Sequence, residues 1–257
     1  MINMKKLALL AAAALLALGM TSTALAAPDN FSVQADELEY NMETGDGTAK
    51  GHVVLVQDGG RATADYAQFN SKSKSGSLKG NVIADKDDAH ITCNEFVMHN
   101  EDYSSAIGSA VVTKEGKSLS ADQVDYYKAR EYAETIGSWA RLTDVDGSTL
   151  DAAKIDYNIA AGVANATGGV TINSQARNLN ATADRAVYET KQNGVIELIG
   201  NAHATQNGNS VAGDKLRLTN TNVATADGNV NIVYIPEEQP APAAPAEAGV
   251  QTDEQLA

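Results

Sequence analysis

The chain has 257 residues, with 19 Lys and Arg against 33 Asp and Glu, which gives a formal net charge of −14. This acidic balance excludes the usual mode of nucleic-acid binding, in which clustered Lys and Arg displace counterions from phosphates. The single cysteine, Cys93, excludes an internal disulfide and any zinc site that needs two thiolates.

The first 26 residues have the pattern of a secretory signal peptide. Lys5 and Lys6 form a positive start, residues 7–18 are twelve consecutive apolar residues, and Ala24-Leu25-Ala26 supplies a small-x-small cleavage pattern. Twelve apolar residues are too few to cross a bilayer, which needs about 20. The sequence therefore predicts export with cleavage near Ala26; an uncleaved N-terminal anchor is the alternative.

A repeat of about 30 residues organises positions 33 to 234. Each copy opens with a small residue, and the next residue is usually Asp. Apolar residues then occupy alternate positions. Seven such openings, 28 to 31 residues apart, begin at Ala35, Ala64, Cys93, Ala121, Ala152, Ala183 and Gly213. A glycine follows 14 to 16 residues after each Asp position, at Gly51, Gly80, Gly108, Gly137, Gly168, Gly200 and Gly228. The alternation indicates half-buried strands.

The phase of the alternation changes at each Asp position. Apolar residues lie two and four positions after it, as in Leu38 and Tyr40, but one and three positions before it, as in Val33 and Ala35. One extra residue at a bulge or bend produces such a change, and a short acidic side chain suits that corner. Around the glycine the phase is kept, so the glycine is expected to point into a tight interior. We predict an all-β stack with two bent strands per repeat.

No constellation of residues indicates catalysis, a metal or a cofactor. The four histidines share no spacing. A row of repeated Asp residues could imitate a catalytic carboxylate set, but Asn94 and Ala153 replace it in two copies, which favours a corner role. Residues 144–147 resemble the start of a calcium loop but lack its later ligands, and we predict a turn. Cys93 and Trp139 fall at inward positions and are expected to fill the core.

The repeats resemble the OstA-like family, which includes the lipopolysaccharide-transport protein LptA and the N-terminal domain of LptD. The shared pattern is Ala-Asp-x-apolar-x-Tyr followed by Gly-[Asn/His/Ser]-Val. It is clearest in residues 35–54, 64–83, 121–126 and 183–202, whereas Arg141 departs from it. The resemblance implies a β-jellyroll, in which two facing antiparallel sheets enclose an apolar groove for lipid acyl chains. It also implies a periplasmic location and end-to-end stacking into a bridge between the two membranes.

Inward apolar side chains near each Asp position are the predicted lining of this groove. They are Leu38, Tyr40, Phe69, Phe96, Met98, Val124, Tyr126, Ile155, Tyr157, Tyr188, Leu216 and Leu218. Many inward Ala and Gly residues would leave a cleft between the sheets. The alternative is a closed, dry core.

These observations predict a non-enzymatic carrier or bridge that moves lipopolysaccharide from the inner to the outer membrane. A structural or adhesive surface protein with a closed core is one alternative, and a polysaccharide-active β-solenoid enzyme is another. The first strand, near 31–40, has no proline or lysine, and the last, near 229–235, has no charge. Both edges are therefore open to pairing with further copies, head to tail. The family resemblance implies LptC-like and LptD-like proteins as partners in such edge pairing.

The expected domain organisation follows from these segments. Residues 1–26 are the signal peptide, 27–235 the seven-repeat β domain, and 236–257 a tail that holds four of the five prolines and no Lys or Arg. Such a tail has little apolar surface to offset its ordering entropy, and we predict that it is disordered.

Overall fold

The computed structural model describes residues 31–57, 59–189, 195–219 and 224–235. The predicted signal peptide and C-terminal tail lie outside these residues. Within them the chain forms seventeen strands and two short 3-10 turns, η1 and η2, and it contains no α-helix. The predicted all-β class is therefore confirmed. Among the described residues, no helix is long and apolar enough to span a bilayer.

The first half of the stack contains strands β1 (Phe31–Gln34), β2 (Glu37–Tyr40), β3 (Asp46–Gln57), β4 (Gly60–Asn70), β5 (Ser75–Lys86), β6 (Ala89–Asn100), β7 (Tyr103–Lys114) and β8 (Lys117–Tyr127), followed by η1 (Lys128–Arg130). The second half contains β9 (Tyr132–Thr143), β10 (Thr149–Ala152), β11 (Lys154–Asn158), β12 (Val163–Ser174), η2 (Gln175–Arg177), β13 (Leu179–Glu189), β14 (Val195–Gln206), β15 (Asn209–Leu218), β16 (Ala224–Asp227) and β17 (Asn231–Val233).

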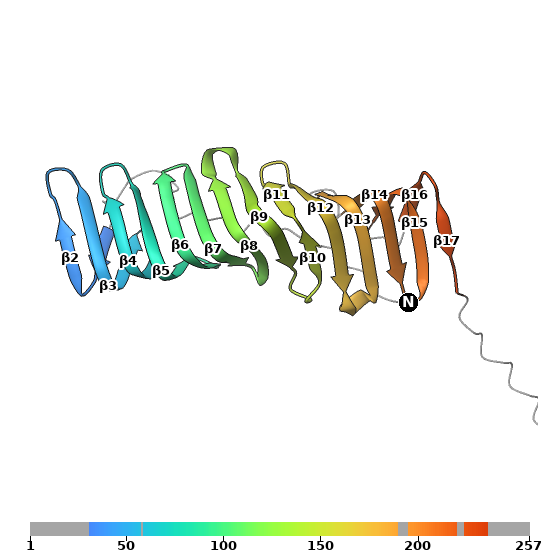
Figure 1. Cartoon of the computed structure of the whole chain (residues 1–257), viewed down its shortest axis with the longest axis horizontal. Coiled ribbons are helices and arrows are strands. Elements are labelled where there is room, and N and C mark those ends of the chain that lie inside the picture. Colours follow the sequence, from blue (N-terminus) through green and yellow to red (C-terminus); the bar gives the residue numbers. More distant parts are fainter. Residues whose placement is uncertain (1–30, 58, 190–194, 220–223, 236–257) are drawn as a thin grey trace, which may run out of the picture.

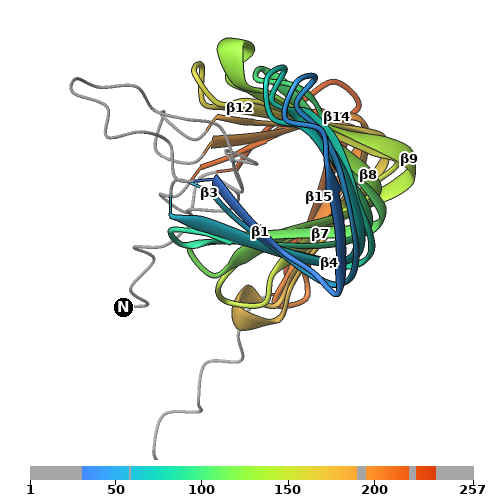
Figure 2. The same ribbon diagram turned by 90° about the vertical axis from the view of Figure 1, so that its left-hand side faces the viewer.

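Successive long strands pair antiparallel along the whole stack (Figure 1). Each long strand bends at its middle, so that one continuous sheet folds into two facing walls, seen along the stack in Figure 2. The short strands show the division, because β1 pairs with the second half of β3 and β2 with its first half. This arrangement matches the predicted β-jellyroll of two facing antiparallel sheets.

The bend is a bulge at the predicted Asp position. Between Lys50 and Val53, two residues of β3 lie opposite the single Asp65 of β4. Ala64 and Ala67 are both buried, so the buried face changes parity at Asp65. The period-two pattern, with its break at each Asp, therefore predicted both the strands and their corners correctly.

The repeated glycine meets the repeated Asp, or its replacement, at each corner. Gly80 has a φ of +78°, and a Cβ on it would overlap the Asp65 carboxylate of the preceding strand. Asn81 is also left-handed, at φ +47°, and its Nδ2 donates a hydrogen bond of 2.9 Å to Asp65 Oδ2. Two consecutive left-handed residues thus wrap around one carboxylate. The predicted crowding is present, but it comes from this outer carboxylate and not from the interior.

The first corner carries a histidine where others carry asparagine. His52 Nδ1 lies 2.8 Å from Asp36 Oδ2, while Asn81, Asn201 and Asn229 occupy the equivalent place. The hydrogen bond with Asp36, helped by its charge, raises the pKa of His52 above its usual value. Protonation of His52 therefore stabilises the folded state. This contribution is fully present below the unfolded-state pKa of about 6.5, and it is lost as the pH rises through the higher pKa of the folded state.

The variant His52→Asn is therefore expected to be less stable than the parent at pH 5.5 and closer to it at pH 8.5. Asn tolerates the left-handed backbone that position 52 adopts, so the corner itself is retained. Thermal unfolding of both proteins across this pH range measures the difference. A gap in melting temperature that stays constant with pH would contradict the prediction.

The fourth corner is one residue longer than the others. Three residues, 137–139, lie opposite Asp122, because Ala121 pairs with Ala140 while Gln123 pairs with Ile136. The extra residue reverses which side chains of β9 point inward and which point outward after the corner.

Arg141 consequently points outward and donates hydrogen bonds of 2.6 and 3.0 Å to the Asp151 carboxylate. Trp139 was expected in the core, and that prediction is wrong. Its side chain is 44% exposed on the outer corner, where Nε1 donates to Asp122 Oδ1 at 2.9 Å. Cys93 is buried as predicted, and desolvation raises the pKa of its thiol to about 11.

Candidate functional site

A pocket of about 520 Å³ lies between the two walls in the N-terminal half of the stack. This volume falls within the range of about 300 to 1,000 Å³ typical of small-molecule sites. Its floor is formed by apolar side chains from several strands: Phe31, Leu55, Ala62, Phe69, Leu78, Phe96, Met98 and Tyr126. We call this pocket the chamber.

The repeat pattern explains how the floor is built. Phe69, Met98 and Tyr126 are the fourth residues after their Asp positions, and Phe96 is the second after its own. Glycines make room beside the largest ring, because a Cβ on Gly47 would overlap Phe69. Phe69 also contacts two aromatic rings at the N-terminal end: Phe31, at a centroid distance of 5.4 Å, and Tyr40, at 6.2 Å.

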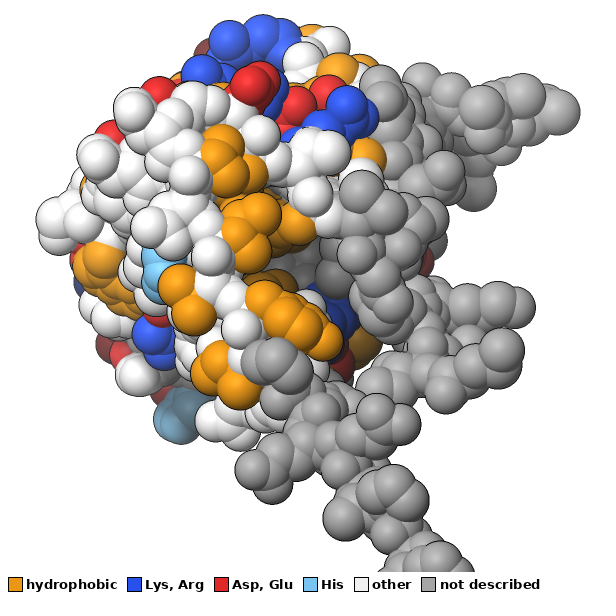
Figure 3. Space-filling view, turned by 90° about the vertical axis from the view of Figure 1, so that its right-hand side faces the viewer, with side chains coloured by type: hydrophobic (Ala, Val, Ile, Leu, Met, Phe, Trp, Pro, Cys, Tyr) orange, Lys and Arg blue, Asp and Glu red, His pale blue; other side chains and the backbone are white. Residues whose placement is uncertain are grey.

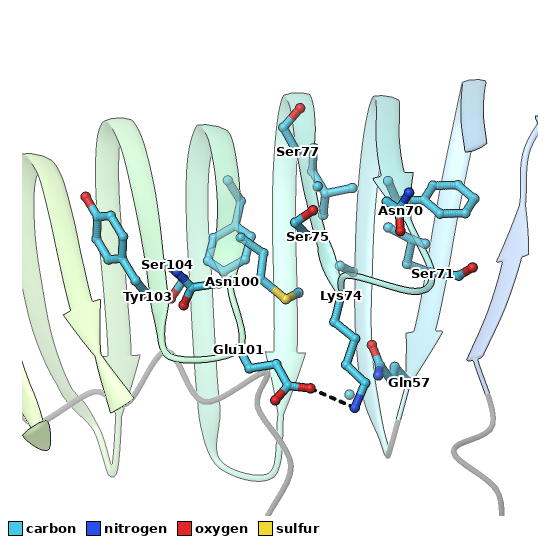
Figure 4. A pocket seen from close by; sticks show the side chains of 18 of the residues that line it. Gln57, Asn70, Ser71, Lys74, Ser75, Ser77, Asn100, Glu101, Tyr103 and Ser104 are labelled. Atoms are coloured by element: carbon cyan, nitrogen blue, oxygen red, sulfur yellow. Dashed lines mark ion pairs between the residues drawn. The ribbon is translucent and has the colours of Figure 1, made fainter. Parts of the chain in front are cut away.

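The mouth of the chamber is polar (Figure 4). Side chains from the strand ends and turns form this rim: Gln57, Asn70, Ser71, Lys74, Ser75, Asn100, Glu101, Asp102, Tyr103, Ser104 and Lys128. Lys74 and Glu101 form an ion pair, with 2.8 Å between Nζ and Oε1. An apolar floor below a polar rim matches an amphiphile, whose chain and head group need opposite surroundings.

Over its described residues, the second half of the stack has a closed interior. Ile155, Tyr157, Tyr188 and Leu216 are all buried, at 9% exposure or less, and so is Val124 on β8, the strand that borders this half. A second pocket, lined partly by Ile155 and Tyr188, has a volume of only about 10 Å³. That is about the smallest space that holds one water molecule. Burial also raises the pKa of Tyr188 to about 12.

The twelve predicted groove residues thus separate into three groups. Phe69, Phe96, Met98 and Tyr126 line the chamber. The five residues of the closed interior are packed against other side chains. Leu38, Tyr40 and Leu218 lie near the ends of the stack, where Leu38 and Tyr40 are 53% and 44% exposed.

Several chamber residues were not predicted. Leu55 and Leu78 lie at inward positions around Gly51 and Gly80, so the alternation around the glycine could have indicated them. The polar rim comes from strand ends and turns, and the alternation of apolar residues does not indicate it. In the described part of the chain, no group of three or more His, Cys, Asp or Glu side chains forms a metal-binding cluster. Residues 144–147 form a turn, closed by a 2.9 Å hydrogen bond from Gly147 N to the Asp144 carbonyl oxygen.

The two ends of the stack are apolar. Most of the exposed large apolar side chains of the described structure lie there: Phe31, Leu38, Tyr40 and Met42 at one end, and Val230, Ile232, Val233, Tyr234 and Ile235 at the other. Figure 3 shows apolar side chains gathered on the C-terminal face. At these ends, β2 pairs with β3, and β17 pairs with β15. The opposite edges of β2 and β17 face outward along the stack (Figure 1).

Bent antiparallel repeats, an amphipathic chamber and apolar ends define a repeat-built β-jellyroll with an internal pocket. A family model described as the LptA/(LptD N-terminal domain) LPS transport protein matches residues 61–223, well over half of the chain. The chain therefore belongs to this family, which confirms the resemblance noted in the repeats.

Among solved structures, the chain is similar to LptH, described as the LptA homologous periplasmic component of the conserved lipopolysaccharide transport device from Pseudomonas aeruginosa. The two share 15% identity, with 80% of this chain and 96% of that chain covered, and a TM-score of 0.22. The search of curated proteins finds no match.

Proposed function

We propose that this protein is a periplasmic, non-enzymatic component of lipopolysaccharide transport that holds lipid acyl chains in its chamber. The chamber itself is the observation that carries the proposal, because an apolar floor with a polar mouth shields acyl chains from water. Each buried methylene contributes about 0.8 kcal/mol. Membership of the LPS transport family and the predicted signal peptide support the same role.

In this proposal only the N-terminal half holds acyl chains. The closed second half, with its tightly packed Ile155 and Leu216, serves as a rigid extension toward the next molecule. The sugar and phosphate parts of the lipid remain outside the chamber, near the polar rim.

Photo-crosslinking in cells tests this proposal. A photoreactive amino acid at Phe69 or Tyr126 is expected to capture lipopolysaccharide, because both side chains line the chamber. The same group at the exposed Glu39 or Lys154 is the control and is expected to give background labelling. At Ile155, inside the closed half, low labelling is expected. Equal labelling at chamber and outer positions would refute the proposal.

The two ends fit assembly by edge pairing. Unpaired N–H and C=O groups on an outermost strand are templates for another strand, and head-to-tail pairing produces open filaments. We propose that β2 and β17 pair with further copies and with LptC-like and LptD-like partners. Bridge formation between the inner and outer membranes follows from this pairing.

Assembly is expected to be concentration-dependent and to fail in the variant Ile232→Lys, which places a charge on the β17 edge. Val145→Lys is the matched control, since Val145 is 66% exposed and Ile232 is 68% exposed, but Val145 lies on a turn away from the ends. Analytical ultracentrifugation of the mature chain measures the species present. Oligomers that persist in Ile232→Lys, or a wild type that stays monomeric at high concentration, would contradict edge pairing.

The closed second half favours one alternative, a structural or adhesive surface protein. That role predicts no lipid in protein extracted without detergent, and a location outside the outer membrane. Mass spectrometry of the purified protein and cell fractionation distinguish the two roles.

A further inference from the structure

Two lysines lie at the mouth of the chamber in a chain that is otherwise strongly acidic. Lys74 comes from the turn between β4 and β5, and Lys128 comes from η1. Figure 4 shows Lys74 reaching toward Glu101, which belongs to the turn between β6 and β7. The ion pair therefore connects two turns that are separated by strands β5 and β6.

Both lysines act on the same carboxylate. The hydrogen bond and the charge of Lys74 lower the pKa of Glu101, and the charge of Lys128 lowers it further to a smaller extent. The backbone holds Lys128 in place, because its N–H donates a 2.8 Å hydrogen bond to the Asp102 carbonyl oxygen. Asp102 is the other acidic residue at this mouth.

The Glu101 carboxylate is easily displaced from this position. Its side chain is 62% exposed and that of Lys74 is 36% exposed. Exposed ion pairs of this kind contribute only about 0 to 1 kcal/mol. An incoming anion that keeps the contact with Lys74 therefore loses little by replacing Glu101. A phosphate monoester carries more charge and more acceptor oxygens than a carboxylate, and it forms strong charge-assisted hydrogen bonds.

We infer that Lys74 and Lys128 form a head-group site for the phosphate of an amphiphile whose acyl chain lies on the chamber floor. This inference rests on the proposed function, because it needs an acyl chain in the chamber. In the empty protein, Glu101 occupies the phosphate position. The ligand is thus held at both ends, by the floor below and by the lysines above.

Isothermal titration calorimetry of the mature chain with amphiphiles of equal chain length tests the site. Dodecyl phosphate is expected to bind about tenfold more tightly than the neutral dodecyl maltoside at low salt, and this preference should shrink as salt rises. The double variant Lys74→Gln/Lys128→Gln should lose the preference and keep the affinity for dodecyl maltoside. Glu101→Gln should bind dodecyl phosphate several-fold more tightly than the wild type.

Lys79→Gln is the matched control. Lys79 also pairs with a glutamate, Glu95, at 3.2 Å, but it does not line the chamber, so its loss should leave the preference unchanged. Unchanged thermal unfolding shows that each variant is folded.

The possible results distinguish failure of the head-group site from failure of the proposed function. If neither amphiphile binds, the chamber proposal fails and the head-group site fails with it. If both bind equally and the lysine variants have no effect, the head-group site is refuted while the chamber stands. Inorganic phosphate alone should bind far more weakly than dodecyl phosphate. Equal affinity for the two would identify a site for free anions and overturn the inference.

Discussion

Met98→Glu is expected to abolish the lipid binding proposed for the chamber. Met98 lines the chamber and is half-buried, so the empty protein tolerates a carboxylate that faces the open space. An acyl chain lying on the floor would have to bury that carboxylate without a partner, at an effective cost of several kcal/mol. An affinity loss of at least about a hundredfold follows, since 1.4 kcal/mol corresponds to a factor of about ten. Mass spectrometry of lipid retained by the purified protein measures the effect.

Met42→Glu provides the comparison for this change. Met42 is 87% exposed at the N-terminal end and does not line the chamber, so the same substitution should leave lipid retention unchanged. Circular dichroism shows whether both variants are folded. Full lipid retention by folded Met98→Glu would rule out the chamber as the acyl-chain site.

Gly80→Ala is expected to cost about 2 to 5 kcal/mol of unfolding free energy. The left-handed backbone at φ +78° contributes about 1 to 2 kcal/mol for a residue with a side chain. The new Cβ would also overlap the Asp65 carboxylate, and overpacking of this kind adds about 1 to 3 kcal/mol. Urea unfolding of the mature chain measures the loss.

Gly147→Ala isolates the contribution of backbone strain. Gly147 has the same φ of +78°, but a Cβ there would meet no atom within 4 Å. Its cost should therefore stay near about 1 to 2 kcal/mol. Equal losses in the two variants would show that the Asp65 carboxylate does not fix the corner.

Sequence alone predicts the strands and corners of this fold because residues close together in the chain determine both. The alternation has a period of two residues, and each break in it coincides with an Asp or its replacement. Trp139 shows the limit of this reasoning. The corner at Gly137 is one residue longer than its counterparts, and a single additional residue moves Trp139 from the inner to the outer face.

The chamber could be predicted only in part. Phe69 and Ile155 occupy comparable inward positions in their repeats, yet Phe69 lines open space and Ile155 is packed. The difference depends on how side chains from opposite walls fill the space between them, which no single strand encodes. The rim residues Lys74 and Glu101 lie on separate turns, and only the stacking of the strands brings them together.

The corner motif also bears on how this molecule could change in length. Each corner is completed by a glycine and by the Asp, or its replacement, about 15 residues before it, as in Gly80 with Asp65 and Gly200 with Asp184. No corner therefore depends on a distant part of the chain, and stability is approximately a sum of terms from each unit and its neighbours. Duplication or loss of one interior unit of about 30 residues would lengthen or shorten the stack while leaving both end faces intact. The distance that one molecule spans is thus set by the number of its units.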